Sequence, residues 1–257
     1  GPNARGQLWI VMECCEGGSV LDLIQGMRTL MTELHIAYIL HCVLRALAFL
    51  HEKKIAHKDI KAANILLTIE GFVKLSDFGI SDEVEIEDLP HEDADKPRLQ
   101  AGSPPWMPPE VWEGKNATDK GDIWSLGITA IEMAEGRAPN SHLNDLKKLR
   151  NKILHGSAPR LGNKMKLEKA PKEGDAKEWS HNFRGFVSSC FIKNAKERPT
   201  AVDLLEQFPF MDQEQFKVTA FTNSDPPALI CRKSLLHPMG IFQVGRKFRQ
   251  RERQGWY

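Results

Sequence analysis

Long apolar runs, a secretion signal and a cysteine framework are all absent from this 257-residue chain. No stretch approaches the roughly 20 apolar residues that a membrane span needs, and the N-terminus lacks a basic-then-apolar signal segment. The five cysteines are odd in number and show no metal-ligand spacing, which favours a reducing compartment. We therefore expect a globular protein of the cytoplasm without a transmembrane segment.

An excess of charge of one sign is absent as well. The 35 basic and 34 acidic residues leave a formal net charge of +1, so composition gives no reason to expect nucleic acid as a partner. The basic C-terminal run from Arg246 to Arg253 leaves two interpretations open. It is either a solvated or disordered end, or a patch for nucleic acid or anionic lipid.

Apolar periodicity predicts a mainly α-helical fold. A long amphipathic helix is expected to begin at Thr32, and the segment 121–134, apolar on nearly all sides, predicts a helix in the middle of a domain. Other expected elements are a buried strand at 8–12, a short helix at 20–24 capped by Ser19, a hairpin of 64–67 and 72–75 turning at Glu70-Gly71, and amphipathic helices at 183–191 and 201–208. We expect a loop at 80–101, and a short helix followed by a long basic insertion within 147–177.

Four polar residues after the long helix form the most informative pattern. Asp59, Lys61, Asn64 and Asp77 place an acid, a lysine and two oxygen ligands for a metal within about twenty residues. Phosphoryl transfer from a nucleotide needs a group that orients the nucleophile and cations that neutralise the transferred phosphate. Together with the tripeptide Asp77-Phe78-Gly79 at its set distance, this pattern would arise by chance in about one chain in a million. It predicts a kinase.

These motifs and several further blocks resemble the eukaryotic protein-kinase fold, with the strongest likeness to sterile-twenty-like (Hippo-type) serine/threonine kinases. The resemblance covers roughly residues 8–212, and 213–257 resemble no family. It implies the helical C-terminal lobe of a kinase, with a short hairpin and one hinge strand but no N-terminal lobe. The blocks that carry the likeness are 8–13, 18–20, 57–67, 75–79, 102–110, 122–136 and 197–201.

The resemblance implies a role for each motif residue. Asp59 would orient and deprotonate the substrate hydroxyl, and Lys61, typical of serine/threonine kinases, would hold the transferred phosphate. Asn64 and Asp77 would bind Mg²⁺, whose preferred ligands are hard oxygens. The nucleotide, ATP, would lie with its adenine between a hinge and a hydrophobic floor. Met12 would stand at the back of that pocket, Glu13 to Cys15 would form the hinge, and Leu66 would pack beneath the base.

The resemblance also implies scaffold contacts. Glu110 and Arg198 would form a buried ion pair, and Asp122 would brace the backbone of the catalytic loop beside His57. Ser103 would contact Asp59 and Lys61, and Trp124 would belong to the core.

Three departures from the family pattern bear on activity. The Gly-rich phosphate loop and the lysine–glutamate pair of the other lobe are missing, and the chain opens on Gly1-Pro2-Asn3 without methionine. We therefore expect a fragment that binds ATP poorly by itself. The segment Pro108-Pro109-Glu110 stands where the family has Ala-Pro-Glu, and Pro105 replaces a bulky residue. These prolines stiffen the wall that receives the substrate.

The third departure is Lys58 where the family has arginine, together with a segment, 82–102, that contains no Ser, Thr or Tyr to phosphorylate. Either this segment is a solvated loop, or its acids replace a loop phosphate by pairing with Lys58 and the basic insertion. The acids are Asp82, Glu83, Glu85, Glu87, Asp88, Glu92, Asp93 and Asp95, and the bases of the insertion are Lys147, Lys148, Arg150, Lys152, Arg160, Lys164, Lys166, Lys169, Lys172 and Lys177.

The expected function is transfer of the γ-phosphate of ATP to serine or threonine hydroxyls of protein substrates by a kinase domain at 1–212, followed by a tail at 213–257. The alternative is a pseudokinase or scaffold that binds partners without catalysis. The intact motif residues favour the enzyme, whereas Lys58 and Pro105 favour the scaffold. Expected partners are protein substrates and, as a further candidate, a regulatory protein.

Overall fold

The computed structural model describes residues 13–26, 31–69, 71–77, 103–162 and 178–208, which form helices and one two-stranded sheet. The expectation of a mainly α fold with a short hairpin is confirmed over this part of the chain. The expected strand at 8–12, the acidic segment, most of the basic insertion and the tail lie outside the described residues.

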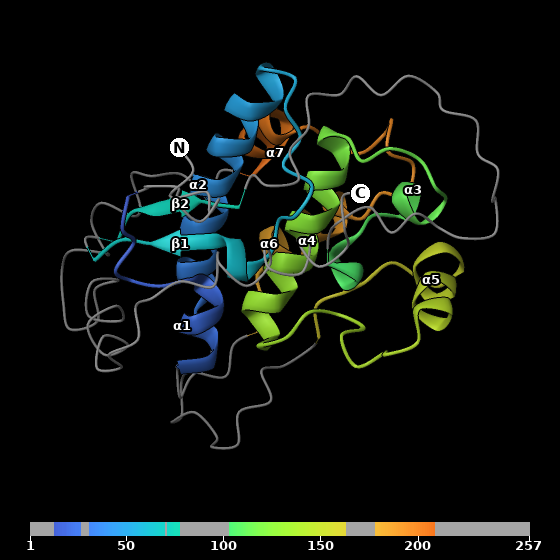
Figure 1. Ribbon diagram of the computed structural model, residues 1–257, viewed down its shortest axis with the longest axis horizontal. Helices are drawn as coiled ribbons and strands as arrows, with labels where there is room; N and C mark the ends of the chain where they lie inside the picture. The colour runs from blue at the N-terminus through green and yellow to red at the C-terminus, as the bar shows by residue number, and fades with distance from the viewer. Residues whose placement is uncertain (1–12, 27–30, 70, 78–102, 163–177, 209–257) are drawn as a thin grey trace, which may run out of the picture.

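Two long helices, α2 (Glu33–Glu52) and α4 (Asp119–Glu135), form the centre of the core. Thr32 caps α2 by accepting a hydrogen bond from the backbone N–H of His35, which satisfies one of the free donors of the first turn. α4 buries every residue from 121 to 134 and ends at Gly136, whose φ of 76° suits glycine. Both expected helices are confirmed, and in Figure 1 they run side by side through the middle of the molecule.

The remaining helices surround this pair. α7 (Ala201–Gln207) packs on α2, α6 (His181–Cys190) on α4, and α5 (Leu146–His155) on the single turn α3 (Pro109–Trp112). Helix α1 (Val20–Gly26) begins after Ser19, whose hydroxyl accepts from the N–H of Asp22, and it extends two residues beyond the expected end. Two 3₁₀ turns, η1 (Ala62–Asn64) and η2 (Pro104–Trp106), complete the described elements. Figure 1 shows α5 beside α3, at the opposite end of the molecule from the hairpin.

The hairpin joins β1 (Ile65–Leu67) to β2 (Val73–Leu75) in antiparallel register, with Leu66 opposite Lys74. Because side chains alternate along a strand, Ile65 and Leu67 enter the core while Leu66 points to the other face, where it is half-buried. The hairpin expected from the sequence is therefore confirmed, although Glu70 of its turn lies outside the described residues.

Among the described helices, α2 has the length and apolar composition of a membrane span. Its apolar stripe is nevertheless part of the protein core, since Ile36, Leu40, Leu44 and Leu47 are fully buried and the helix packs on α4 and α7. Core packing thus accounts for the composition of this helix.

Candidate functional site

Asp59 stands at the centre of a compact polar cluster between α2 and α4. Its carboxylate oxygen Oδ2 accepts hydrogen bonds from Lys61 Nζ at 2.6 Å and from Asn64 Nδ2 at 2.9 Å. The same ammonium group of Lys61 lies 2.7 Å from Ser103 Oγ, across 42 residues of sequence. The structure therefore brings three of the four motif residues, together with Ser103, to one place.

The other carboxylate oxygen of Asp59, Oδ1, is buried and accepts no hydrogen bond from the described residues. Burial by itself would raise the pKa of this carboxyl group, but the hydrogen bond and positive charge of Lys61, with help from Asn64 and Ser103, outweigh it and hold the pKa below its usual value. Asp59 is consequently ionised at neutral pH.

The backbone that carries Asp59 is held by Asp122 of α4. Oδ2 of Asp122 accepts from the N–H of His57 at 2.8 Å, and Oδ1 accepts from the N–H of Lys58 at 2.7 Å. His51, at the end of α2, contributes a third bond through Nε2 at 2.8 Å to Oδ2. This carboxylate therefore restrains Lys58 at a φ of 69°, a region that non-glycine residues rarely adopt.

The buried ring of His57 joins the catalytic loop to the end of the hairpin. The N–H of Asp59 donates to Nδ1 at 3.3 Å, so the ring proton lies on Nε2, which is 2.9 Å from the carbonyl oxygen of Ser76. His57 and Asp122 thus occupy the scaffold positions that the sequence predicts for them.

Asn64 has a geometry that suits a metal ligand. Its Nδ2 donates both to the backbone oxygen of Asp59 at 2.8 Å and to the carboxylate, so the side-chain oxygen is left for a cation. Ser76 binds the Asn64 carbonyl through its N–H at 2.9 Å and its hydroxyl at 3.0 Å, which positions exposed Asp77, the next residue, beside this turn.

The donor chemistry of this pair fits Mg²⁺, which takes a few protein oxygens and completes its shell with water and nucleotide phosphates. The described residues contain no cluster of three or more His, Cys, Asp or Glu side chains that could hold a metal by themselves. A cation at Asn64 and Asp77 would therefore depend on a bound nucleotide.

Glu13, Cys15 and Leu66, which are expected to contact the nucleotide base, are among the described residues. Glu13 forms an exposed ion pair with Lys74 of β2 at 2.8 Å, and Ser19 bridges to Leu66. Leu66 thus lies beside the segment that contains Glu13 and Cys15, and the role of these residues in binding a base stays a prediction. Burial, then the negative charge of Glu13, raises the pKa of the Cys15 thiol, so this half-buried cysteine stays protonated. Met12 lies outside the described residues.

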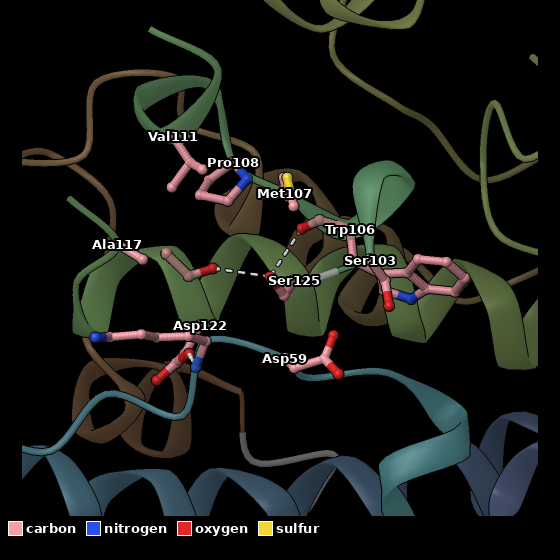
Figure 2. A pocket seen from close by; sticks show the side chains of 11 residues that line it. Asp59, Ser103, Trp106, Met107, Pro108, Val111, Ala117, Asp122 and Ser125 are labelled. Carbon is pink, nitrogen blue, oxygen red and sulfur yellow. Dashed lines mark hydrogen bonds between the residues drawn. The ribbon is translucent and has the colours of Figure 1, made fainter. Parts of the chain in front are cut away.

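The segment from Ser103 to Trp112 forms one wall of a small pocket, opposite Asp59 and Asp122. Figure 2 shows its side chains facing Asp59 and Asp122 across a small pocket, which Lys58 also lines. The backbone oxygen of Trp106 accepts from Ser125 Oγ of α4 at 2.8 Å, shown dashed in Figure 2. The pocket walls near Met107, Pro108 and Val111 are apolar, in keeping with the proline-rich sequence of this segment.

Two residues of this site are not identified by the sequence analysis. Glu132 of α4 accepts from the N–H of Ala62 at 3.1 Å and from Trp106 Nε1 at 3.2 Å, and burial raises its pKa to about 7 despite both bonds and nearby Lys61. His51 is the second. An acid inside the apolar run 123–134 is a signal that could have identified Glu132, because a carboxylate there requires buried partners.

The expected ion pair behind the pocket is present. Arg198, 1% exposed, binds both carboxylate oxygens of Glu110, at 2.8 and 3.1 Å. Its guanidinium also donates to the backbone oxygens of Lys120, Ile192 and Lys193. These bonds join the pocket wall to the segment before α7.

Comparisons with known proteins agree with this geometry. Residues 3–211 match the family described as protein kinase domain, so the chain belongs to the protein kinase family. Among curated relatives, the serine/threonine-protein kinases dst1 and dst4 of Dictyostelium discoideum are 44% and 43% identical over 77% and 80% of the chain, and cst-1 of Caenorhabditis elegans is 41% identical over 79%. These relatives confirm the likeness to sterile-twenty-like kinases. The matched region is only 24%, 39% and 37% of the respective relatives' lengths.

Proposed function

We propose that this chain contains the catalytic loop of a cytoplasmic serine/threonine kinase, which transfers the γ-phosphate of ATP to protein hydroxyls. The observation that carries the proposal is the convergence of Asp59, Lys61 and Asn64, with one buried oxygen of Asp59 that has no partner among the described residues. The catalytic domain covers 1–212, and 213–257 form a tail.

Each side chain has a defined task. The substrate hydroxyl donates to Asp59 Oδ1, and the carboxylate takes its proton as the hydroxyl oxygen bonds to the γ-phosphorus and the bond from that phosphorus to ADP breaks. Lys61, which already neutralises Oδ2 of Asp59, is positioned for the transferred phosphate. Bound Mg²⁺ would supply neutralising charge on the phosphates, held by the Asn64 side-chain oxygen and by Asp77.

The nucleotide base would lie against Leu66 and the hinge residues Met12, Glu13 and Cys15. Leu66 faces away from the core, so the base would gain an apolar contact that the fold leaves half-covered. This wall is only one side of a cleft. By itself the 257-residue chain is therefore expected to bind ATP weakly and to transfer phosphate slowly.

Radiolabelled phosphate transfer to a generic basic protein tests the proposal, with the full-length protein that contains this chain. Asp59→Asn is expected to lower the rate by about 10²–10⁴-fold, because a general base is lost. Asp77→Asn is expected to abolish incorporation, and Lys53→Gln, on the exposed end of α2, should match the wild type. Equal incorporation by all proteins would show a contaminating kinase, and a wild type without incorporation would favour the scaffold alternative.

A further inference from the structure

Helix α5 presents positive charge to solvent on one face. Lys147, Lys148 and Lys152 are exposed, with Arg150 at the edge of the face, whereas Leu149 and Ile153 are buried where α5 packs on α3. The helix contains no acidic residue, and within the described part of the chain none of the three lysines forms an ion pair. We refer to Lys147, Lys148, Arg150 and Lys152 as the α5 basic face.

Helix stability does not account for this face. Lys147 and Lys148 lie in the first turn, where the helix dipole disfavours cations. Lys148 and Lys152 are four residues apart, so their like charges repel. Asp145 offsets part of the unfavourable electrostatic energy, because its side chain accepts hydrogen bonds from the backbone N–H groups of Lys147 and Lys148. Lys152 lies in the last turn, where the dipole favours a cation. The positions of Lys147 and Lys148 are therefore the ones that point to an interaction outside the fold.

The α5 basic face is linked to the candidate site by a short path. Arg150 Nε donates to the backbone oxygen of Trp112 at 3.0 Å, and Trp112 ends the segment that begins at Ser103, the partner of Lys61. Nine residues extended span at most about 30 Å, and the helical turns of this segment shorten the distance. A peptide bound at Asp59 would therefore reach α5 within roughly ten residues of its acceptor hydroxyl.

We propose that the α5 basic face is a docking surface for an acidic segment of the protein substrates. The inference rests on the proposed kinase function, whose substrate class it specifies. Two observations support the proposal: the positive charge of the α5 basic face is complementary to an acidic segment, and the bond of Arg150 to Trp112 joins this face to the pocket wall. Leu149 and Ile153 are buried where α5 packs on α3, and Leu146, 41% exposed, is the one large apolar side chain that this helix exposes. This is little apolar surface for insertion into a lipid bilayer, which disfavours a membrane. Helix α5 also contains no Phe, Tyr or Trp side chain on which bases could stack.

Fluorescence anisotropy tests the docking surface without requiring catalysis. The probe is a labelled peptide with one serine, a flexible linker of about eight residues and a run of about six glutamates, and its matched control carries glutamines instead. The variant Lys148→Glu/Lys152→Glu is compared with Lys53→Glu/Lys196→Glu, which changes net charge equally on other exposed surfaces. A protein with the acids of 82–95 changed to serine or asparagine is measured as well, to remove competition from the chain itself.

The double substitution Lys148→Glu/Lys152→Glu is expected to weaken binding of the acidic peptide about tenfold. Lys53→Glu/Lys196→Glu is expected to weaken it less than about twofold. In phosphate transfer by the full-length protein, the α5 pair should raise KM for the acidic peptide with kcat unchanged, and leave the glutamine peptide unaffected. The proposal would be overturned if both double substitutions weakened peptide binding equally, or if the peptide did not bind even to the protein without the 82–95 acids. Tighter binding of phosphatidylserine vesicles or of a single-stranded oligonucleotide than of the acidic peptide would overturn it as well. If peptide binding follows the expectation but neither peptide is phosphorylated, the docking surface stands and the proposed function fails.

Discussion

Glu132 Oε2 and Trp106 Nε1 lie 3.2 Å apart, and this hydrogen bond joins the central helix to the pocket wall. The same oxygen accepts from the N–H of Ala62 in the catalytic loop. One buried carboxyl group therefore supports both sides of the candidate site. Because burial raises its pKa to about 7, the support depends on pH.

Glu132→Gln is expected to change the pH dependence of stability. In the wild type the folded state retains the proton up to about pH 7 whereas the unfolded state releases it near pH 4.5, so the free energy of unfolding falls as pH rises between these values. Glutamine accepts the same two hydrogen bonds without charge. Relative to the wild type, the variant should therefore gain on the order of 2 kcal/mol between pH 4 and pH 8, measured by urea unfolding.

The matched control for this experiment is Glu113→Gln, whose side chain is 46% exposed and paired with Lys115. It should follow the wild-type curve within a few tenths of a kcal/mol. Parallel curves for wild type and Glu132→Gln would show that this carboxyl group titrates normally.

Arg198→Leu is expected to lower the free energy of unfolding by about 3–5 kcal/mol, because it leaves the Glu110 carboxylate buried without its counter-charge. Adding Glu110→Gln should recover part of this loss, since the stranded charge is removed. Lys115→Ala, at an exposed ion pair, should cost no more than about 0.5 kcal/mol. Strictly additive effects of the two buried substitutions in chemical denaturation would contradict the paired geometry.

Asp122→Asn is expected to affect both stability and activity. The amide can no longer accept at both oxygens, so one of the N–H groups of His57 and Lys58, or His51, loses its partner. We expect a loss of about 2 kcal/mol in unfolding free energy and a fall in kcat of about tenfold at a temperature where the variant is fully folded. Asp119→Asn, also in the first turn of α4, is the control and should leave kcat unaltered.

Gly127→Ala is expected to destabilise the fold through a steric conflict between α4 and α6. An added Cβ would lie 2.6 Å from Cys190 Cβ and 3.0 Å from Phe191 Cε1, so the helices would have to separate. The expected cost is about 1–3 kcal/mol or more in thermal unfolding. Gly26→Ala, whose Cβ would meet nothing within 4 Å, should instead stabilise slightly because alanine favours the helix. Similar effects at both glycines would rule out close packing as the cause.

Local patterns account for the elements that the sequence predicts correctly. The stripe on α2 and the uniformly apolar α4 are read from spacing alone, and the caps at Ser19 and Thr32 follow from side chains that bond to N–H groups three residues away. The hairpin follows from two short β-rich runs around a glycine turn. Element ends differ by one or two residues, since caps and frayed turns decide them.

Contacts between distant segments are less visible in the sequence. The bonds of Asp122 to His57 and of Arg198 to Glu110 are expected only through the resemblance to a family, whereas those of His51 and Glu132 are not expected at all. They join residues 26 to 88 positions apart, and no periodic signal marks such a pair.

The amino-acid sequence alone was enough to determine the helical fold class, the kinase motif and the identity of the motif side chains near Asp59. Helix period, capping and motif spacing all depend on residues that are close together in the chain. Only the tertiary structure decided that Oδ1 of Asp59 has no hydrogen-bond partner among the described residues, that Glu132 is a buried acid bonded to both the catalytic loop and the pocket wall, and that Lys147, Lys148 and Lys152 of α5 are exposed to solvent. The physical reason is that burial and partnership depend on which surfaces meet when α2, α4 and α3 pack together, and that arrangement is set by the whole core at once.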